Sequence, residues 1–428
     1  MSGIKDIDGR LVVDGVDVVA AAIEFGTPMF LYGGDSITVG ARELKESLGD
    51  NVEICYSIKA NPAIGVCRLI QRSGVDGAEI ASSGELVAAM ASGFSPERIL
   101  FAGPGKTDEE LEHAIGEGVS QINAESVGEI KRIDAVAGRL GVVQLVGIRV
   151  NLEDNGSGHG KIRTGGGAQK FGIDESGVVD AIGLIGRLNH VSFAGLHTML
   201  GSQVLDASEM LRSCELGIEM GIRVSSASGI EIQSFNFGGG LGVSHHEDKE
   251  GFDLAGFGRG VSELIMKARK TIGLAGTRFM IEPGRVLVSE FGVYVSRVVD
   301  VKESGGETFA ILDGGIHHAL LPITANSYKV VIADRVDVEE TNPVMLGGPL
   351  CTSADQWRSS VELPGVKVGD VVAMMNSGAY GLTASMNMFL SRGTPVEVLV
   401  VEGQCSVIRE RSSAESVLDG QSIPQSLE

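Results

Sequence analysis

Cysteine is scarce in this sequence, and its spacing excludes two common uses of the residue. The 428 residues include five cysteines, an odd number with no C-x-x-C pair. A disulfide framework or a zinc site is therefore not expected, and a reducing cytoplasm is the expected compartment. The first residues, MSGIKDIDGRLVVDGVD, also lack the basic and then apolar pattern of a secretory signal.

Long apolar runs and an excess of positive charge are missing as well. No apolar stretch approaches the roughly 20 residues that a membrane span needs. The 35 lysines and arginines stand against 56 aspartates and glutamates, which gives a formal net charge of −21. This balance argues against binding to nucleic acid or to an anionic membrane surface.

The rest of the composition is that of a folded α/β protein. Apolar residues make up 43% and charged residues 21%, so a sizeable core can be buried and disorder is excluded for most of the chain. Glycine, at 61 residues, is about twice as frequent as usual and clusters between apolar runs, which predicts many tight turns.

Short β-rich runs alternate with helix-patterned segments through the first two thirds of the chain. The eight expected strands cover residues 52–57, 77–81, 98–102, 119–124, 142–150, 192–197, 233–238 and 278–282. Helix-patterned segments such as 62–74 lie between most of them and end at a glycine, the usual C-cap. Eight strands in this alternation predict a (β/α)8 barrel of the TIM type, with a doubly wound open sheet as the alternative.

The pattern changes after about residue 285, where strand-length segments follow one another with few helices. This predicts a β-rich second domain, which the N-terminal run RLVVDGVDV joins. The expected division is a barrel over 28–285, a β-rich domain made of 1–27 and 286–411, and a polar tail over 412–428.

Several motifs place reactive or anion-binding groups at the ends of expected strands. Lys59 ends the run CYSIKAN, at the face of a barrel where active sites lie, although a rim lysine paired with a carboxylate is the plainer interpretation. Gly239 and Gly240 in FNFGGGLG would let backbone N–H groups approach an anion, or would only form a tight turn. Glu282 and Arg285 flank the Pro-Gly turn of IEPGR and either enter a site or pair with each other.

Two further motifs lie in the β-rich part. Cys351 stands in the small-residue loop GGPLCTSAD, where a thiol is either exposed and acid–base active or buried and inert. Tyr380 in NSGAYGLTAS either reaches a phosphate through its hydroxyl or lies at the edge of the core.

In their order, these motifs resemble the fold-type III pyridoxal-phosphate decarboxylases, the group of diaminopimelate, ornithine and arginine decarboxylases. The resemblance covers roughly residues 28–400 and rests on YSIKAN, E-x-A-S-S-G-E-L, KFG, His197, GGG, EPGR, C-x-x-x-D and GAY. It implies an alanine-racemase-like (β/α)8 barrel that carries pyridoxal 5'-phosphate, followed by a β domain. It also implies a homodimer in which each active site receives the cysteine loop of the partner subunit.

The resemblance gives each matching residue a role. Lys59 would form the Schiff base with the cofactor aldehyde, and Cys351 would return a proton to the substrate α-carbon. Glu282 would face the pyridine nitrogen and keep it protonated, so that the ring accepts the electron pair left by carbon dioxide. The other implied cofactor-binding residues are Glu79, His197, Ser202, Gly239, Gly240, Gly284, Arg285 and Tyr380. The implied substrate-side residues are Arg149, Thr352 and Asp355.

The departures from the family pattern concern the distal end of the substrate. Diaminopimelate enzymes typically carry Glu after the cysteine and ornithine enzymes Asp, whereas Thr352 follows Cys351 here. Diaminopimelate enzymes also place an arginine in the loop after D-x-G, and residues 313–329 contain none. An unpartnered buried charge costs several kcal/mol, so a free charged distal end is disfavoured.

The longer loop HTMLGSQ and the run DGGIHH resemble instead the branch that decarboxylates glutamate tethered to an acyl carrier protein. Carrier proteins are acidic, so a basic patch such as Lys161, Arg163 and Lys170 would have to overcome the net charge of −21. We therefore expect a pyridoxal-phosphate-dependent α-decarboxylase of an amino acid with a neutral or carrier-tethered distal end.

Three alternatives remain at this point. The first is an ordinary diaminopimelate, ornithine or lysine decarboxylase that uses other residues as clamps. The second is a non-catalytic homologue that binds the cofactor, against which the presence of Lys59 and Cys351 counts. A racemase is less favoured, because that related group sets an arginine against the pyridine nitrogen, where Glu282 is acidic.

Overall fold

The computed structural model describes residues 3–152, 162–163, 167–199, 201–245, 251–325, 328–357 and 359–427. The chain divides into two compact units. The barrel unit comprises Thr38–Ser244 and Lys249–Leu287, and the β unit comprises Met1–Ile37, His245–Asp248 and Val288–Glu428. In the part of the chain that the structure describes, no helix is long and apolar enough to cross a membrane.

The barrel unit contains a closed barrel of eight parallel strands. They are β5 (Val52–Ser57), β6 (Gly77–Ile80), β7 (Ile99–Phe101), β8 (Gln121–Ala124), β9 (Gln144–Asn151), β12 (Val191–Thr198), β14 (Ser234–Asn236) and β15 (Arg278–Ile281). Their spatial order is β9-β12-β14-β15-β5-β6-β7-β8, and β8 pairs with β9 to close the ring. All eight expected strands are present, and closure excludes the doubly wound alternative.

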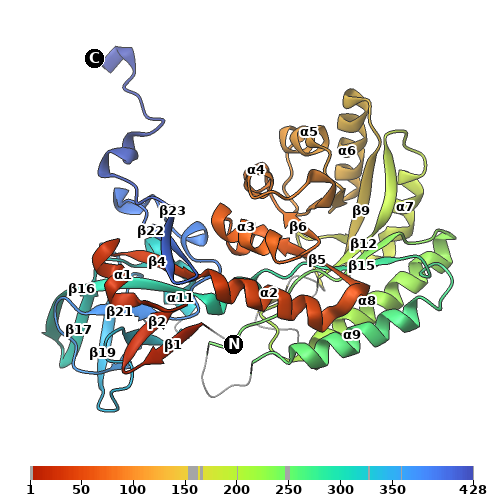
Figure 1. Ribbon diagram of the computed structural model, residues 1–428. Helices are drawn as coiled ribbons and strands as arrows, with labels where there is room; N and C mark the ends of the chain where they lie inside the picture. The colour runs from red at the N-terminus through yellow and green to blue at the C-terminus, as the bar shows by residue number, and fades with distance from the viewer. Residues whose placement is uncertain are drawn as a thin grey trace. The chain divides into compact units, whose positions relative to one another are not determined.

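Helices cover the outside of the barrel and alternate with its strands (Figure 1). They are α2 (Gly34–Leu48), α3 (Ile64–Arg72), α4 (Ser83–Ala91), α5 (Asp108–Glu117), α6 (Val127–Leu140), α7 (Val178–Ile185), α8 (Ala207–Ser228) and α9 (Leu254–Ala268). Local signals set their ends: Thr107 and Glu110 form a capping box at the start of α5, and Gly118 and Gly141 adopt left-handed backbone after α5 and α6.

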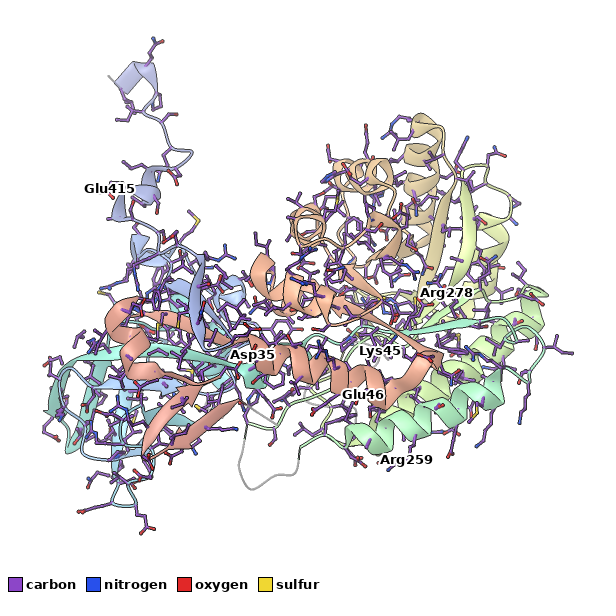
Figure 2. All side chains as sticks on the ribbon, in the orientation of Figure 1. Asp35, Lys45, Glu46, Arg259, Arg278 and Glu415 are labelled. Atoms are coloured by element: carbon purple, nitrogen blue, oxygen red, sulfur yellow. The ribbon has the colours of Figure 1, made fainter. Side chains whose placement is uncertain are left out.

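Ion pairs fix the amino ends of the barrel strands. Figure 2 labels two of the basic residues involved, Lys45 on α2 and Arg278 at the start of β15. Lys45 Nζ lies 2.7 Å from Asp76, whose carboxylate also accepts the backbone N–H of Ile54 at 2.8 Å. Arg278 binds both carboxylate oxygens of Glu53 at 2.8 and 2.6 Å. These contacts thus lie at the end of the barrel opposite to the carboxyl ends of its strands, where barrel enzymes carry their active sites.

The β unit is built around the long strand β16 (Gly292–Ser304), which pairs with β4, β17 and β21. Its other strands are β4 (Met29–Gly33), β17 (Glu307–Leu312), β18 (Val330–Ile332), β19 (Asn342–Gly347), β20 (Val361–Leu363), β21 (Val371–Met374), β22 (Val396–Val401) and β23 (Gln404–Arg409), with β1 (Ile4–Ile7), β2 (Arg10–Val13) and β3 (Val16–Asp17) in a separate small sheet. The helices of this unit are α1 (Val18–Glu24) and α11 (Ile316–Ala325). Apolar side chains of β2, α1, β4, β16, β21 and β22 form its core.

The structure corrects the expected start of the barrel at residue 28. Residues 29–33 form β4, which pairs antiparallel with β16 and parallel with β22 in the β unit. All five residues of β4 are buried, as is usual for a central strand covered on both faces. An apolar run followed by a helix fits the first unit of a barrel equally well, so only the pairing reveals where this strand belongs.

Candidate active site

Lys59 lies at the carboxyl end of β5, in a short turn over Ile58–Ala60. The register of β5 and β6 sets Ser57 opposite Glu79. Lys59 Nζ and Ser57 Oγ both donate to Glu79 Oε2, each at 2.5 Å. The side chain of Glu79 is 3% exposed and that of Lys59 is 40% exposed, so the carboxylate orients an amine that a small molecule can reach.

A second cluster joins His197, Asn236 and Glu282. The register of β12 and β14 places His197 beside Asn236, and Glu282 directly follows β15. Asn236 Nδ2 donates to Glu282 Oε1 at 2.6 Å, and His197 Nε2 lies 3.4 Å from Glu282 Oε2. All three side chains are buried, and neither ring nitrogen of His197 has a hydrogen-bond partner among the described residues. A buried ring of this kind suits stacking against another planar group.

The charge of Glu282 follows from opposing effects. Burial raises the pKa of the Glu282 carboxyl, but its interactions with His197 and Lys59 and the hydrogen bond from Asn236 outweigh burial and lower the pKa to about 2. Glu282 is therefore a carboxylate at neutral pH. A fixed negative charge at this depth favours a bound group that carries a proton or a positive charge.

The glycine run after β14 packs closely against the residue that follows β15. Gly238 donates its N–H to Asn236 Oδ1 at 2.8 Å, and Glu282 donates its own N–H to Gly238 O, also at 2.8 Å. A Cβ on Gly239 would lie 2.4 Å from Glu282 O, and Gly240 has a φ of +108°. Only glycine fits these positions, and a turn without side chains is of the type that lets backbone N–H groups approach an anion.

Ser202 is fixed beside the same turn by its neighbours in the chain. It lies in the two-residue strand β13 (Gly201–Ser202), which pairs with β10 (Ile162–Arg163). Gln203 Nε2 donates to Val243 O at 2.6 Å, and Val204 donates its N–H to Gly240 O at 3.0 Å. The HTMLGSQ and GGG motifs are therefore neighbours in space, as a shared phosphate site requires.

The EPGR turn lies against the segment that carries Lys59. Ser57 donates its N–H to Pro283 O at 3.0 Å, and a Cβ on Gly284 would lie 2.8 Å from the Cβ of Ala60. The absence of a side chain on Gly284 thus permits this packing. Arg285 opens the short helix α10 (Arg285–Val288) directly after the turn.

Arg149, which the resemblance places on the substrate side, contacts a carboxylate and an aromatic ring in the structure. Its Nη1 lies 3.0 Å from Glu125 Oε1, and its guanidinium lies 4.4 Å from the centre of the Phe171 ring. Glu125 also accepts the backbone N–H groups of Gly103 and Gly172 at 3.1 and 2.7 Å. Arg149 and Glu125 therefore hold the KFG segment. Glu125 was missed, although it directly follows β8 and the strand-end rule that selected Lys59 applies to it.

Four of the expected site residues belong to the β unit: Cys351, Thr352, Asp355 and Tyr380. Cys351 is exposed, whereas the other four cysteines are buried or half-buried. Asp355 is 2% exposed and accepts the N–H groups of Ile316 at 2.8 Å and Leu350 at 2.9 Å. Asp355 thus connects the start of α11 to the loop that presents Cys351.

Thr352 and Tyr380 have local conformations of different kinds. Thr352 Oγ1 accepts the N–H of Ala354 at 3.3 Å, so the hydroxyl stabilises its own turn. Tyr380 has a φ of +52°, a backbone conformation that non-glycine residues rarely adopt and that often marks functional sites.

Of the expected basic patch, the side chains of Lys161 and Arg163 lie outside the described residues, and Lys170 is exposed beside the Phe171 ring.

Comparison with known proteins gives the class to which this arrangement belongs. Residues 35–289 match the family described as "Pyridoxal-dependent decarboxylase, pyridoxal binding domain". The chain therefore belongs to the fold-type III pyridoxal-phosphate-dependent decarboxylases, and it is a carboxy-lyase that acts on an amino acid.

Individual relatives are similar over nearly their whole length. The L-glutamyl-[BtrI acyl-carrier protein] decarboxylase of Niallia circulans is 34% identical, over 95% of this chain and 96% of the relative. The diaminopimelate decarboxylase of Methanothermobacter thermautotrophicus is 32% identical, over 98% of this chain and 97% of the relative. The crystal structure of diaminopimelate decarboxylase from M. jannaschii superposes with a TM-score of 0.92 at 29% identity, covering 100% of this chain and 99% of that one.

The residues of the barrel unit fit the cofactor of this family. Pyridoxal phosphate needs an amine, a cradle for its phosphate and a charged partner for its ring nitrogen. Lys59 supplies an accessible amine, the turn at Gly239 and Gly240 supplies the cradle, and Glu282 is a buried carboxylate. When bound, the cofactor accepts the electron pair that the substrate α-carbon retains as carbon dioxide leaves.

Proposed function

We propose that the chain decarboxylates an amino acid whose distal end has no free charge, such as a glutamyl group tethered to an acyl carrier protein. The observation that carries this proposal is the chemistry of the residue after Cys351. Thr352 is uncharged, and its hydroxyl oxygen already accepts a hydrogen bond from Ala354. No carboxylate stands at this position to receive a distal ammonium group.

In the loop that would hold a distal carboxylate, residues 313–325 are also without a positive charge, and Lys329 stands at its exposed end. Burial lowers the pKa of His317 to about 3 and that of His318 to about 4, so both imidazoles are neutral at pH 7. Asp313 accepts hydrogen bonds from Thr27 Oγ1 at 2.5 Å and from the N–H of Arg297 at 2.9 Å. Between residues 313 and 325, all of which are described, no side chain is cationic at neutral pH. A free distal carboxylate would be buried there without a partner, at a cost of several kcal/mol.

A relative supports the same substrate class. The Niallia circulans protein is named for a glutamyl group carried by an acyl carrier protein. Its identity of 34% exceeds that of the first diaminopimelate enzyme by only 2 percentage points, since that enzyme is 32% identical. The chemistry of the two loops therefore discriminates between the substrates better than the overall similarity does.

In this proposal the barrel residues bind the cofactor and control protons. Lys59 attaches the cofactor, and the ring of His197 stacks on it. Glu282, a carboxylate at neutral pH, holds a proton at the ring nitrogen. Ser202, Gly239, Gly240 and the turn from Glu282 to Arg285, together with Tyr380, bind the phosphate. Cys351 returns a proton to the α-carbon, in the site of a second subunit.

Arg392 favours a second candidate, an ordinary diaminopimelate decarboxylase. Arg392 is exposed in the β unit, and its charge acts on both loops. Burial and the charge of Arg392 both lower the pKa of His317. At Asp355, burial raises the pKa of the carboxyl and the charge of Arg392 lowers it. A cation in this position would serve as a clamp for a free distal carboxylate.

Steady-state kinetics separate the two candidates. We expect glutamate γ-esters, pantetheine thioesters or carrier-bound glutamate to have a kcat/KM at least roughly tenfold above that of diaminopimelate, ornithine or lysine, since a penalty of ~1.4 kcal/mol already gives a factor of ten. If diaminopimelate is the best substrate, and Arg392→Ala abolishes that preference while Arg212→Ala does not, the second candidate is correct.

Covalent labelling tests the cofactor site independently of the substrate. Reduction with borohydride should fix pyridoxal phosphate on the peptide that contains Lys59. Lys59→Ala should remove the label, whereas Lys45→Ala should keep it, because Lys45 pairs with Asp76 at the amino end of the barrel. A label on another lysine of the cofactor-saturated wild-type protein contradicts the assignment.

A further inference from the structure

Asn236 is a fully buried amide that connects two parts of the proposed cofactor site. It is 0% exposed and ends β14, two residues before the first glycine of the run. Its Oδ1 accepts the N–H of Gly238 at 2.8 Å, and its Nδ2 donates to Glu282 Oε1 at 2.6 Å. Since the Gly238 nitrogen can only donate here, the orientation of the amide is fixed, and the group on Glu282 must be the NH₂.

The hydrogen bond from Asn236 determines which carboxylate oxygen of Glu282 is left to contact a ligand. Oε1 is engaged by Asn236, and Oε2 faces His197 Nε2 at 3.4 Å. The backbone bond from Glu282 N–H to Gly238 O links the same two turns a second time. The phosphate cradle and the ring-nitrogen carboxylate are thus held in one geometry by the Asn236 side chain and by this backbone hydrogen bond.

We propose that Asn236 is a positioning residue that orients Glu282 toward the cofactor ring nitrogen and couples it to the phosphate cradle. The inference rests on the proposed roles of Glu282 and of the glycine turn. It predicts that Asn236 acts on the cofactor through the ring nitrogen, and not only through the stability of the barrel.

A cofactor analogue with carbon in place of the ring nitrogen separates these two effects. Wild-type protein should bind pyridoxal phosphate roughly tenfold or more tightly than the analogue, since hydrogen bonds to charged groups have about this strength. Asn236→Ala should reduce this preference to about threefold or less. Asn123→Ala is the matched control: Asn123 is another fully buried amide, on β8, and its loss should leave the preference unchanged.

Asn236→Asp gives a pH-dependent test of the same idea. At low pH the introduced carboxyl is protonated, and it would donate to Glu282 and accept from Gly238 as the amide does. When ionised, it would repel the Glu282 carboxylate about 2.6 Å away. The other titratable groups around Glu282 are His197, Lys59 and Cys55, and they are the same in both proteins.

The affinity ratio of this variant to wild type should therefore fall as pH rises. We expect the ratio to stay within about threefold at pH 5.5 and to drop by roughly tenfold or more at pH 8. Asn236→Ala should show a ratio that does not change with pH. If Asn236→Asp is unfolded at pH 8, the analogue experiment on Asn236→Ala remains decisive.

Two outcomes have different meanings. If wild-type protein does not distinguish the two cofactors, the proposed role of Glu282 is wrong. If wild type distinguishes them and Asn236→Ala does so equally well, the positioning role of Asn236 is overturned and the amide is only structural.

Discussion

Glu282 shows at a single residue how burial and charge oppose each other. Its pKa of about 2 lies below the ordinary value of 4.5. A carboxyl with a lowered pKa contributes stability that is present above its unfolded pKa and is lost as pH falls through the folded pKa. The contribution of Glu282 should therefore disappear between about pH 4.5 and pH 2.

Urea unfolding of the cofactor-free protein between pH 6 and pH 3 tests this expectation. Wild type should lose more unfolding free energy over the window than Glu282→Gln, whose side chain does not titrate. Glu46→Gln, an exposed change on α2 (Figure 2), should follow the wild type. Equal losses in wild type and Glu282→Gln would show that the folded-state pKa is not depressed.

Residues within a continuous motif were predictable from the sequence, whereas a pair formed by distant residues was not. Lys59, Cys351 and the EPGR turn stand in motifs whose order is readable along the chain. Asn236 lies inside the quoted run FNFGGGLG, but its partner Glu282 is 46 residues away, directly after β15, which lies beside β14 only in the folded sheet. A pair that depends on strand order leaves no local spacing to read.

At the scale of elements, the glycine turns are the most constrained part of the site. A Cβ on Gly239 would lie 2.4 Å from the carbonyl oxygen of Glu282, far closer than real contacts. Gly239→Ala should therefore push the two turns apart, weaken pyridoxal phosphate binding by roughly tenfold or more and cost about 1–3 kcal/mol of stability.

Gly105→Ala is the matched control, because a Cβ at Gly105 meets no atom within 4 Å. Cofactor titration followed by absorbance and thermal melting measures both quantities. Unchanged affinity in Gly239→Ala would mean that the turn relaxes without loss and that the phosphate binds elsewhere.

The loop that presents Cys351 depends on Asp355 in a similar way. Both carboxylate oxygens of Asp355 accept backbone N–H groups, from Ile316 and Leu350. Asp355→Asn replaces one acceptor by a donor, leaving one buried N–H unpaired at a cost of about 1–3 kcal/mol. We expect kcat to fall by roughly tenfold while cofactor affinity stays unchanged, since the barrel residues are untouched.

An exposed aspartate provides the comparison for that variant. Asp300→Asn, on β16, should leave kcat and cofactor affinity as in the wild type. A loss of cofactor binding in Asp355→Asn would assign Asp355 to the cofactor site and not to the loop.

Helices and strands were predictable from the sequence where local residues alone determine their type and their ends. The eight barrel strands and the caps of α5 and α6 follow from alternation, capping residues and glycine. β4 was misplaced because a buried apolar strand contains no information about its neighbours. The local sequence alone does not identify the short strands β19 and β20, because their pairing with β17 and with each other stabilises them more than their composition does.

For the whole molecule, the proposed active site combines residues from both units of the fold. Lys59 and Glu282 belong to the barrel unit, and Cys351 belongs to the β unit. The proposed homodimer supplies Cys351 from the second subunit. Lys59→Ala and Cys351→Ala proteins should each be inactive alone, because each dimer then has the same defect in both sites.

Mixing the two inactive proteins should restore activity. About half of the re-formed dimers are mixed, and each mixed dimer has one site with both residues intact, so recovery approaches about a quarter of wild-type activity. Mixing Lys59→Ala with Glu282→Gln is the control: these residues share one barrel, so every barrel in a mixed dimer is defective and no recovery is expected. If subunit exchange is demonstrated and the first mixture also stays inactive, Cys351 acts within its own chain or not at all.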